Sequence, residues 1–131
     1  MLESENCLTI CEKNLESNKM RTQEHILRKI IRRLLRNRSW KQTCDSGGST
    51  SLTYQSLVCP ERHVWIDTWI DVYGAIIIDL ENWNDETQWD NSVAHFTAHD
   101  CETIIQIARL WLKGEPLDAI TEIFATLKAV D

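Results

Sequence analysis

The chain has 131 residues, of which 43% are hydrophobic and 26% are charged, and its formal net charge is −6. This length favours a single folded domain over residues 1–131, in which residues 1–20 form a short helix or a loosely ordered arm. The sequence has no run of about eighteen apolar residues, so we expect no membrane span, and no basic flank precedes the N-terminal apolar patch, so we expect no secretory signal. The cysteines show no paired spacing, so we expect no disulfide framework. Together these features favour a cytoplasmic protein.

The first clear element is a basic amphipathic helix within residues 21–41. Apolar pairs recur every four residues in HILRKIIRRLLRNR, and basic side chains fill the opposite side. Residues 21–41 hold eight Lys/Arg against one Glu, net +7, whereas residues 42–131 hold four against fifteen Asp/Glu, net −11. The chain is therefore an acidic body that carries one basic helix.

A glycine-containing loop over residues 44–51 separates this helix from a series of predicted strands. Four strands are expected, and a polar loop, NWNDETQWDN, lies between the third and the fourth. Short connections at Pro60 and Gly74 favour antiparallel neighbours, and thus a meander. The four predicted strands span residues 51–58, 63–72, 74–82 and 92–98.

Two amphipathic helices close the chain. The first begins near Cys101, with Thr97 or Asp100 as the candidate cap, and ends at the Gly114–Pro116 stop signal. The second spans residues 117–129. The order α-β-β-β-β-α-α predicts an α+β fold, in which the basic helix and the two C-terminal helices pack on an antiparallel four-stranded sheet.

The predicted second strand, HVWIDTWIDV, has two different faces. With the two-residue period of a strand, Val64, Ile66 and Thr68 belong to a core face, and indoles alternate with carboxylates on the other. Tryptophan anchors with acidic neighbours are typical of protein interfaces, so this face is the predicted binding surface for a basic protein partner. With the following strand and loop, the predicted partner-binding residues are Trp65, Asp67, Trp69, Asp71, Asp79, Glu81, Trp83, Asp85, Glu86, Trp89 and Asp90. The alternative is that a C-terminal helix covers this face and buries the indoles.

Size, acidity, a single α+β domain and the acidic aromatic stretch from WIDTWIDV to ENWNDETQWD resemble the small immunity proteins of bacterial toxin–immunity pairs, including those of contact-dependent growth inhibition. These families share no diagnostic motif, so the resemblance transfers no individual residue. It implies a protein that neutralises a cognate toxin, often a basic nuclease, by covering its active site or an adjacent surface.

The competing hypothesis is a nucleic-acid-binding regulator that uses the basic helix. Its candidate contacts are Arg28, Lys29, Arg32, Arg33 and Arg36. The acidic body opposes this role because it would repel a long polyanion at close range.

Catalytic and metal-binding signals are weak in this sequence. It contains no glycine-rich phosphate loop, serine-nucleophile elbow or dinucleotide fingerprint, so we expect no enzyme and no cofactor. His95, His99 and Cys101 are the candidate zinc ligands, but on a strand positions four apart lie roughly 13 Å from each other. No metal site is therefore predicted.

Overall fold

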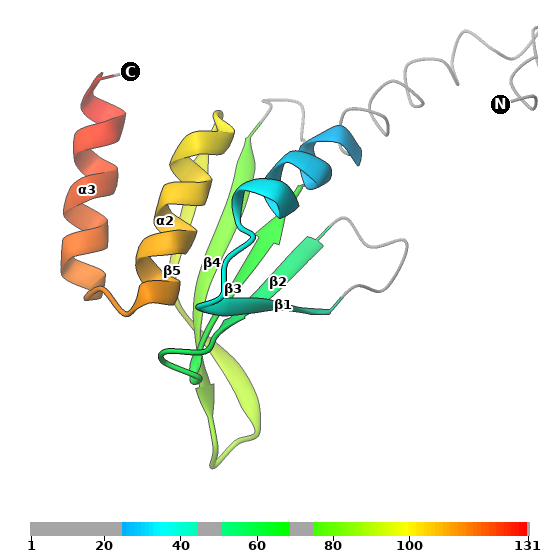
Figure 1. Ribbon diagram of the computed structural model, residues 1–131. Helices are drawn as coiled ribbons and strands as arrows, with labels where there is room; N and C mark the ends of the chain where they lie inside the picture. Colours follow the sequence, from blue (N-terminus) through cyan, green and yellow to red (C-terminus); the bar gives the residue numbers. More distant parts are fainter. Residues whose placement is uncertain (1–24, 45–50, 69–74, 131) are drawn as a thin grey trace, which may run out of the picture.

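The fold is a five-stranded antiparallel sheet in the order β1-β2-β3-β4-β5, with helices on one face (Figure 1). The computed structural model describes residues 25–44, 51–68 and 75–130. The predicted α+β class and the meander are confirmed, but the predicted number of four strands is wrong. Residues 25–34 form the N-terminal helix, followed by β1 (Trp40–Cys44), β2 (Ser51–Ser56), β3 (Arg62–Asp67), β4 (Ile76–Asn84), β5 (Trp89–Ala98), α2 (Cys101–Lys113) and α3 (Leu117–Val130).

The additional strand, β1, begins in the last residues of the segment that the sequence assigns to the basic helix, and it continues beyond that segment to Cys44. The helix ends at residue 34, and a turn follows in which the Asn37 side chain accepts a hydrogen bond from the Ser39 amide at 2.8 Å. Trp40 then enters the core, where its indole N–H donates to the Leu35 carbonyl. The rest of β1 is polar, as is common for an edge strand, so it has little apolar alternation by which it could be recognised.

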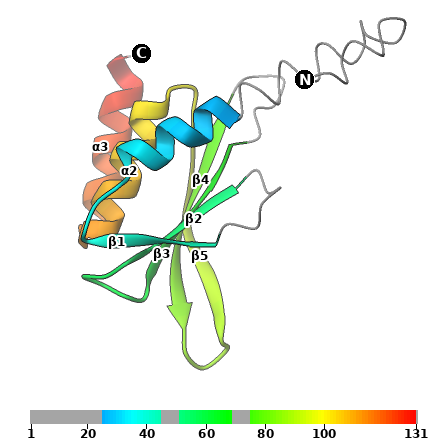
Figure 2. The same ribbon diagram turned by 45° about the vertical axis from the view of Figure 1, so that its right-hand side comes forward.

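The predicted loop over residues 82–91 is instead the end of a β-hairpin. Strand β4 continues to Asn84 and β5 begins at Trp89, which leaves only residues 85–88 as the turn. The Asn84 side chain closes this turn by accepting from the amides of Glu86 at 2.8 Å and Thr87 at 3.2 Å. Polar composition indicates a loop, but cross-strand hydrogen bonds extend the two strands beyond the core, and the hairpin protrudes from the sheet (Figures 1 and 2).

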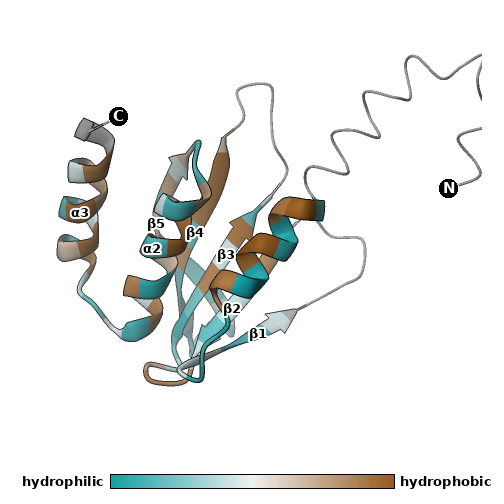
Figure 3. Cartoon of the chain, turned by 45° about the horizontal axis from the view of Figure 1, so that its top comes forward, coloured by the Kyte–Doolittle hydropathy of each residue, from teal (hydrophilic) through white to brown (hydrophobic). Residues whose placement is uncertain are grey.

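The face of the sheet that meets the helices, here called the covered face, carries the core. Rows of apolar side chains cross the strands in register, for example Leu52, Ile66, Ile78 and Phe96. The helix over residues 25–34 and α2 lie over these rows, and α3 packs against α2 and places Phe124 with its ring centroid 4.8 Å from that of Phe96. Figure 3 shows hydrophobic colour along the strands beneath the helices and hydrophilic colour at the protruding hairpin.

Helix α2 begins and ends where the sequence predicts. The Asp100 side chain accepts from the Thr103 amide at 2.9 Å, and Gly114 ends the helix in the left-handed conformation with φ of 101°. A side chain at Gly114 would also place its Cβ 3.2 Å from the Cys59 sulfur, so this position both ends the helix and allows the β2–β3 loop to pack closely.

Only part of the predicted second strand can be compared with the structure. Strand β3 ends at Asp67, and residues 69–72 and the predicted turn at Gly74 lie outside the described residues. Within the described part, the alternation is confirmed, because Val64, Ile66 and Thr68 are buried.

Candidate functional site

The opposite face of the sheet, here called the open face, carries the candidate site. The helices that the structure describes all lie on the covered face (Figures 1 and 2), so the alternative in which a C-terminal helix covers the tryptophans is wrong for the described part of β3. By strand register, the open face includes exposed Lys41 on β1 and, on β2 to β5, Ser51, Thr53, Gln55, His63, Trp65, Asp67, Ile77, Asp79, Glu81, Trp83, Asp90, Ser92, His95 and Thr97. Carboxylates, imidazoles and indoles are prominent among its side chains.

Two histidine–aspartate pairs bridge strands of the open face. His95 Nδ1 on β5 lies 2.8 Å from Asp79 Oδ1 on β4, and His63 Nδ1 on β3 lies 3.2 Å from Asp90 Oδ1 on β5. The predicted partner-binding set contains neither histidine, because each pair joins residues on different strands that lie far apart in the chain. The only available signal is the register of the strands, which the sequence does not fix.

Glu81 occupies the centre of this face between the two pairs. Partial burial raises the pKa of its carboxyl to about 7, and the negative charges of Asp90 and then Asp79 contribute further. Strands β4 and β5 contain no Lys or Arg that could compensate these charges. The protonated form of the Glu81 carboxyl is therefore favoured relative to an ordinary glutamate near neutral pH, and a positive charge brought to this face would favour its ionised form.

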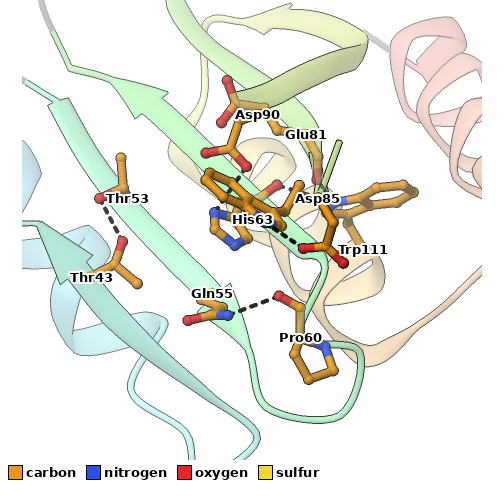
Figure 4. Close-up of polar contacts among 10 residues, drawn as sticks. Thr43, Thr53, Gln55, Pro60, His63, Glu81, Asp85, Asp90 and Trp111 are labelled. Atoms are coloured by element: carbon orange, nitrogen blue, oxygen red, sulfur yellow. Dashed lines mark hydrogen bonds and ion pairs between the residues drawn. The ribbon is translucent and has the colours of Figure 1, made fainter. Parts of the chain in front are cut away.

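Toward the hairpin, the open face ends in a pocket of about 510 Å³. Trp83 forms one wall, with its indole N–H donating to Asp85 Oδ1 at 2.9 Å and its ring nearly parallel to His63 at a centroid distance of 6.4 Å. The backbone N–H of Trp83 donates to the Glu61 carbonyl at 2.7 Å, which ties the β2–β3 loop to β4. Figure 4 shows Gln55, Pro60 and Asp85 around His63. The lining residues are Gln55, Pro60, Glu61, His63, Trp83 and Asp85.

The predicted partner-binding residues are distributed unevenly over this structure. Five of them lie partly exposed on the open face, namely Trp65, Asp67, Asp79, Glu81 and Trp83, and exposed Asp90 joins them. Asp85 and Glu86 are exposed in the hairpin turn. Trp69 and Asp71 lie outside the described residues.

Trp89 requires a correction. It is 72% exposed, but it pairs with Asn84 and is adjacent to Asp90 in the strand, so its side chain projects from the opposite side of the hairpin. The prediction that Trp89 lies beside the other tryptophans assumes that residues 82–91 form a loop. In a strand, successive side chains point to opposite faces, so Trp89 and Asp90 cannot both lie on the open face. Gln55, Pro60, Glu61 and His63 are the pocket residues absent from the predicted set.

The basic residues proposed for nucleic-acid contact lie on the helix over residues 25–34 and just after it. Lys29, Arg33 and Arg36 are exposed, whereas Arg28 and Arg32 are partly buried. The apolar side of this helix packs into the core over the covered face, through Ile31 and then Leu35. The basic row and the open face are therefore on opposite sides of the sheet.

The candidate metal ligands do not come together. Among the described residues, no group of three or more His, Cys, Asp or Glu side chains could hold a metal ion. Asp100 is engaged as the cap of α2. Burial, followed by the charges of Asp100 and Glu102, raises the pKa of the Cys101 thiol and so favours its protonated, less reactive form.

Within the described part of the chain, no helix is both long enough and apolar enough to cross a membrane. No family model, curated protein or solved structure matches the chain. The chemistry of the open face is therefore the basis for a functional proposal.

Proposed function

We propose that this chain is a protein-binding domain whose open face recognises a basic protein partner, and that it acts as an immunity protein toward a bacterial toxin. The observation that carries the proposal is the position of Glu81 between Asp79 and Asp90, on strands without Lys or Arg. Like charges held together raise the free energy of the unbound face, and a cationic partner relieves this repulsion.

The aromatic residues of the open face supply the apolar part of such an interface. Trp65 lies beside Asp79 in the register of β3 and β4, and Trp83 lies beside Asp90 in that of β4 and β5. Each indole therefore has a carboxylate as its cross-strand neighbour. Aromatic anchors of this kind slow dissociation, while the surrounding charges accelerate association with a basic partner.

The immunity class rests on the resemblance described for the sequence, and the open face is compatible with it. A toxin domain that acts on nucleic acid has a basic substrate-binding surface. An acidic β-sheet face can occupy such a surface and compete with the substrate. The partner in this proposal is therefore the basic substrate-binding surface of a toxin.

A peptide selection tests the protein-binding proposal even though the partner is unidentified. Random 12-residue peptides displayed on phage are selected on the full chain at low salt, and peptides rich in Arg and Lys should be enriched. Their affinity should fall about tenfold or more in the double variant Asp79→Asn/Asp90→Asn, since charge-assisted contacts contribute about 1.5–3 kcal/mol each. The matched control is Asp118→Asn/Glu122→Gln, which removes the same charge from exposed positions on α3.

Equal effects of the two double variants would refute the proposal, because they would show that net charge and not the open face attracts the peptides. Selection of peptides without basic enrichment would refute it as well. Binding should also strengthen as pH rises through about 7, since a bound cation favours the ionised Glu81 carboxyl.

The immunity proposal has its own test in cells. A strain that expresses the product of the gene immediately upstream of this one should grow only when the chain is co-expressed, and the Asp79→Asn/Asp90→Asn variant should fail to restore growth. Restoration by that variant at equal protein abundance would contradict the proposal.

Nucleic-acid binding by the basic helix is the contrasting outcome. In fluorescence anisotropy with a duplex DNA at about 150 mM salt, we expect no binding. Saturable binding that Arg33→Ala/Arg36→Ala abolishes would favour the regulator hypothesis instead.

A further inference from the structure

The geometry points to the pocket between the β2–β3 loop and the β4–β5 hairpin as the receptor for a single arginine side chain of the protein partner. This inference rests on the proposed function, and it names the part of the open face that anchors the partner and the side chain that it takes. The pocket volume of about 510 Å³ lies within the range of roughly 300–1,000 Å³ that is typical of ligand sites.

Hydrogen-bond acceptors surround this pocket. One Asp85 oxygen, Oδ1, accepts from the Trp83 indole, which leaves Oδ2 for a ligand. The Gln55 side chain donates through Nε2 to the Pro60 carbonyl at 2.8 Å, so its own carbonyl oxygen can accept (Figure 4). The Glu61 carboxylate is exposed, and within the described part of the chain it forms no ion pair. The pocket thus presents carboxylate and amide oxygens together.

The non-acidic walls favour arginine over lysine. Guanidinium is planar, carries five N–H donors and stacks on aromatic rings, whereas an ammonium group is a strongly hydrated point charge. Trp83 and His63 supply nearly parallel aromatic planes, and Pro60 supplies an apolar wall for the aliphatic part of the side chain. Hydrogen-bond acceptors distributed around an aromatic ring suit the several N–H donors of a planar guanidinium better than the single charge of an ammonium group.

The chain itself contains an example of this mode of recognition. Arg62, adjacent to His63 but on the covered side of β3, lies with its guanidinium carbon 3.8 Å from the ring centroid of Trp111. The same guanidinium donates to the carbonyls of Trp111 at 3.1 Å and Glu115 at 2.6 Å. An arginine stacked on an indole and bonded to nearby oxygens is therefore already used to join β3 to α2.

Exposed apolar side chains in the loop that forms one wall of the pocket suit a protein partner more than a free amino acid. Leu57 and Val58 in the β2–β3 loop are 53% and 59% exposed, and they precede Pro60 of the pocket wall. A polar pocket in the same loop region as exposed apolar side chains can serve as an interface hot spot, in which surrounding contacts exclude water from a central anchor. The partner should therefore present its arginine beside apolar residues.

Nuclear magnetic resonance of the full, nitrogen-15-labelled chain tests this inference with three small probes at pH 7. N-acetyl-arginine amide should shift the Trp83 indole and Gln55 side-chain amide signals saturably, with a dissociation constant on the order of 1–10 mM. N-acetyl-citrulline amide, which has nearly the same shape but no charge, should produce no saturable shift. N-acetyl-lysine amide should bind at least threefold more weakly than the arginine probe.

Glu61→Gln should weaken the arginine probe about five- to tenfold, through loss of a charge-assisted contact. The matched control is Glu122→Gln, an exposed acid of α3 that does not line the pocket, and it should have no effect. Equal binding of the arginine and lysine probes, or equal effects of the two substitutions, would overturn the inference.

The basic peptides from the selection separate this inference from the proposed function. If they bind the open face and depend on Asp79 and Asp90, but Glu61→Gln leaves their affinity unchanged, the arginine pocket is wrong and the protein-binding proposal remains. If the arginine probe binds as expected while no basic peptide is selected, the pocket is retained and the proposed partner class is wrong.

Discussion

The two faces of the central sheet use the same strands for different purposes. Along β4, Ile76, Ile78 and Leu80 are buried against the helices, while Ile77, Asp79 and Glu81 face the other way. Stability therefore depends mainly on one face, and the other is left available for charge that would be costly to bury. The comparison shows how a small domain separates folding from recognition with a period of two residues.

Polar groups are treated differently on the two faces. Ser56, fully buried on the covered side, donates to the Leu112 carbonyl at 2.6 Å and accepts from the amides of Val58 at 3.1 Å and Cys59 at 2.9 Å. On the open face, partial burial raises the pKa of the Glu81 carboxyl to about 7, and the negative charges of Asp90 and Asp79 contribute further. The Ser56 hydroxyl has its hydrogen-bond partners within the fold, whereas the negative charges of the open face would be stabilised by a cation from a partner.

The largest contrast is expected between two adjacent isoleucines of β4. Ile78→Ala on the covered face should lower the free energy of unfolding by about 3–4 kcal/mol, because it leaves a cavity in the core. Ile77→Ala, the same change on the partly exposed open face, should cost about 1 kcal/mol. Urea denaturation followed by circular dichroism measures both, and equal losses would contradict the division between the faces.

A smaller contrast is expected between two serines. Ser56→Ala removes a side chain that satisfies three backbone groups and should cost about 2 kcal/mol of unfolding free energy. Ser92→Ala, on the exposed part of β5, should change stability by less than about 0.5 kcal/mol. The same denaturation experiment measures both changes in the free energy of unfolding. A large loss of stability in Ser92→Ala would show that the open face also contributes to folding.

The smallest expected effect is a gain in stability. The pKa of Glu81 is raised from 4.5 to about 7, so the folded state binds more protons than the unfolded state between these values, and stability falls as pH rises through them. Glu81→Gln should therefore raise the free energy of unfolding at pH 8 by about 1 kcal/mol, after allowance for solvent screening of a half-exposed group, and should have little effect at pH 4.

The control for this substitution is Glu86→Gln in the exposed hairpin turn, which should change the free energy of unfolding by less than about 0.5 kcal/mol. A gain at Glu81 that is equal at pH 4 and pH 8 would show that the effect is not electrostatic. It would also remove the main support for uncompensated negative charge on the open face.

Local pattern predicts most helices and the central strands because their periodicity is strong. Helix α2 has both a cap at Asp100 and a stop at Gly114, and both are confirmed. Strand β1 escapes prediction because Trp40 is its only large buried residue, and the hairpin end does so because polar residues there are paired by backbone hydrogen bonds. Periodicity therefore identifies elements that bury a face and overlooks those held mainly by their neighbours.

The candidate site can be predicted only as far as single strands allow. Alternation along β3 correctly separates Trp65 and Asp67 from the buried set, and the acids of β4 are correctly placed beside them. The sequence could not reveal that His63 lies beside Asp90 or that Glu61 and Trp83 enclose one pocket. These neighbours depend on strand register and loop closure.

The sequence alone determined the α+β class, the two-faced strands and the segregation of an acidic body from a basic helix, because each follows from local periodicity and charge. Only the tertiary structure decided which face the helices cover, which acids gather around Glu81, and where the open face forms a pocket. These properties depend on contacts between residues distant in the chain, and a period of two or 3.6 residues contains no information about such distances.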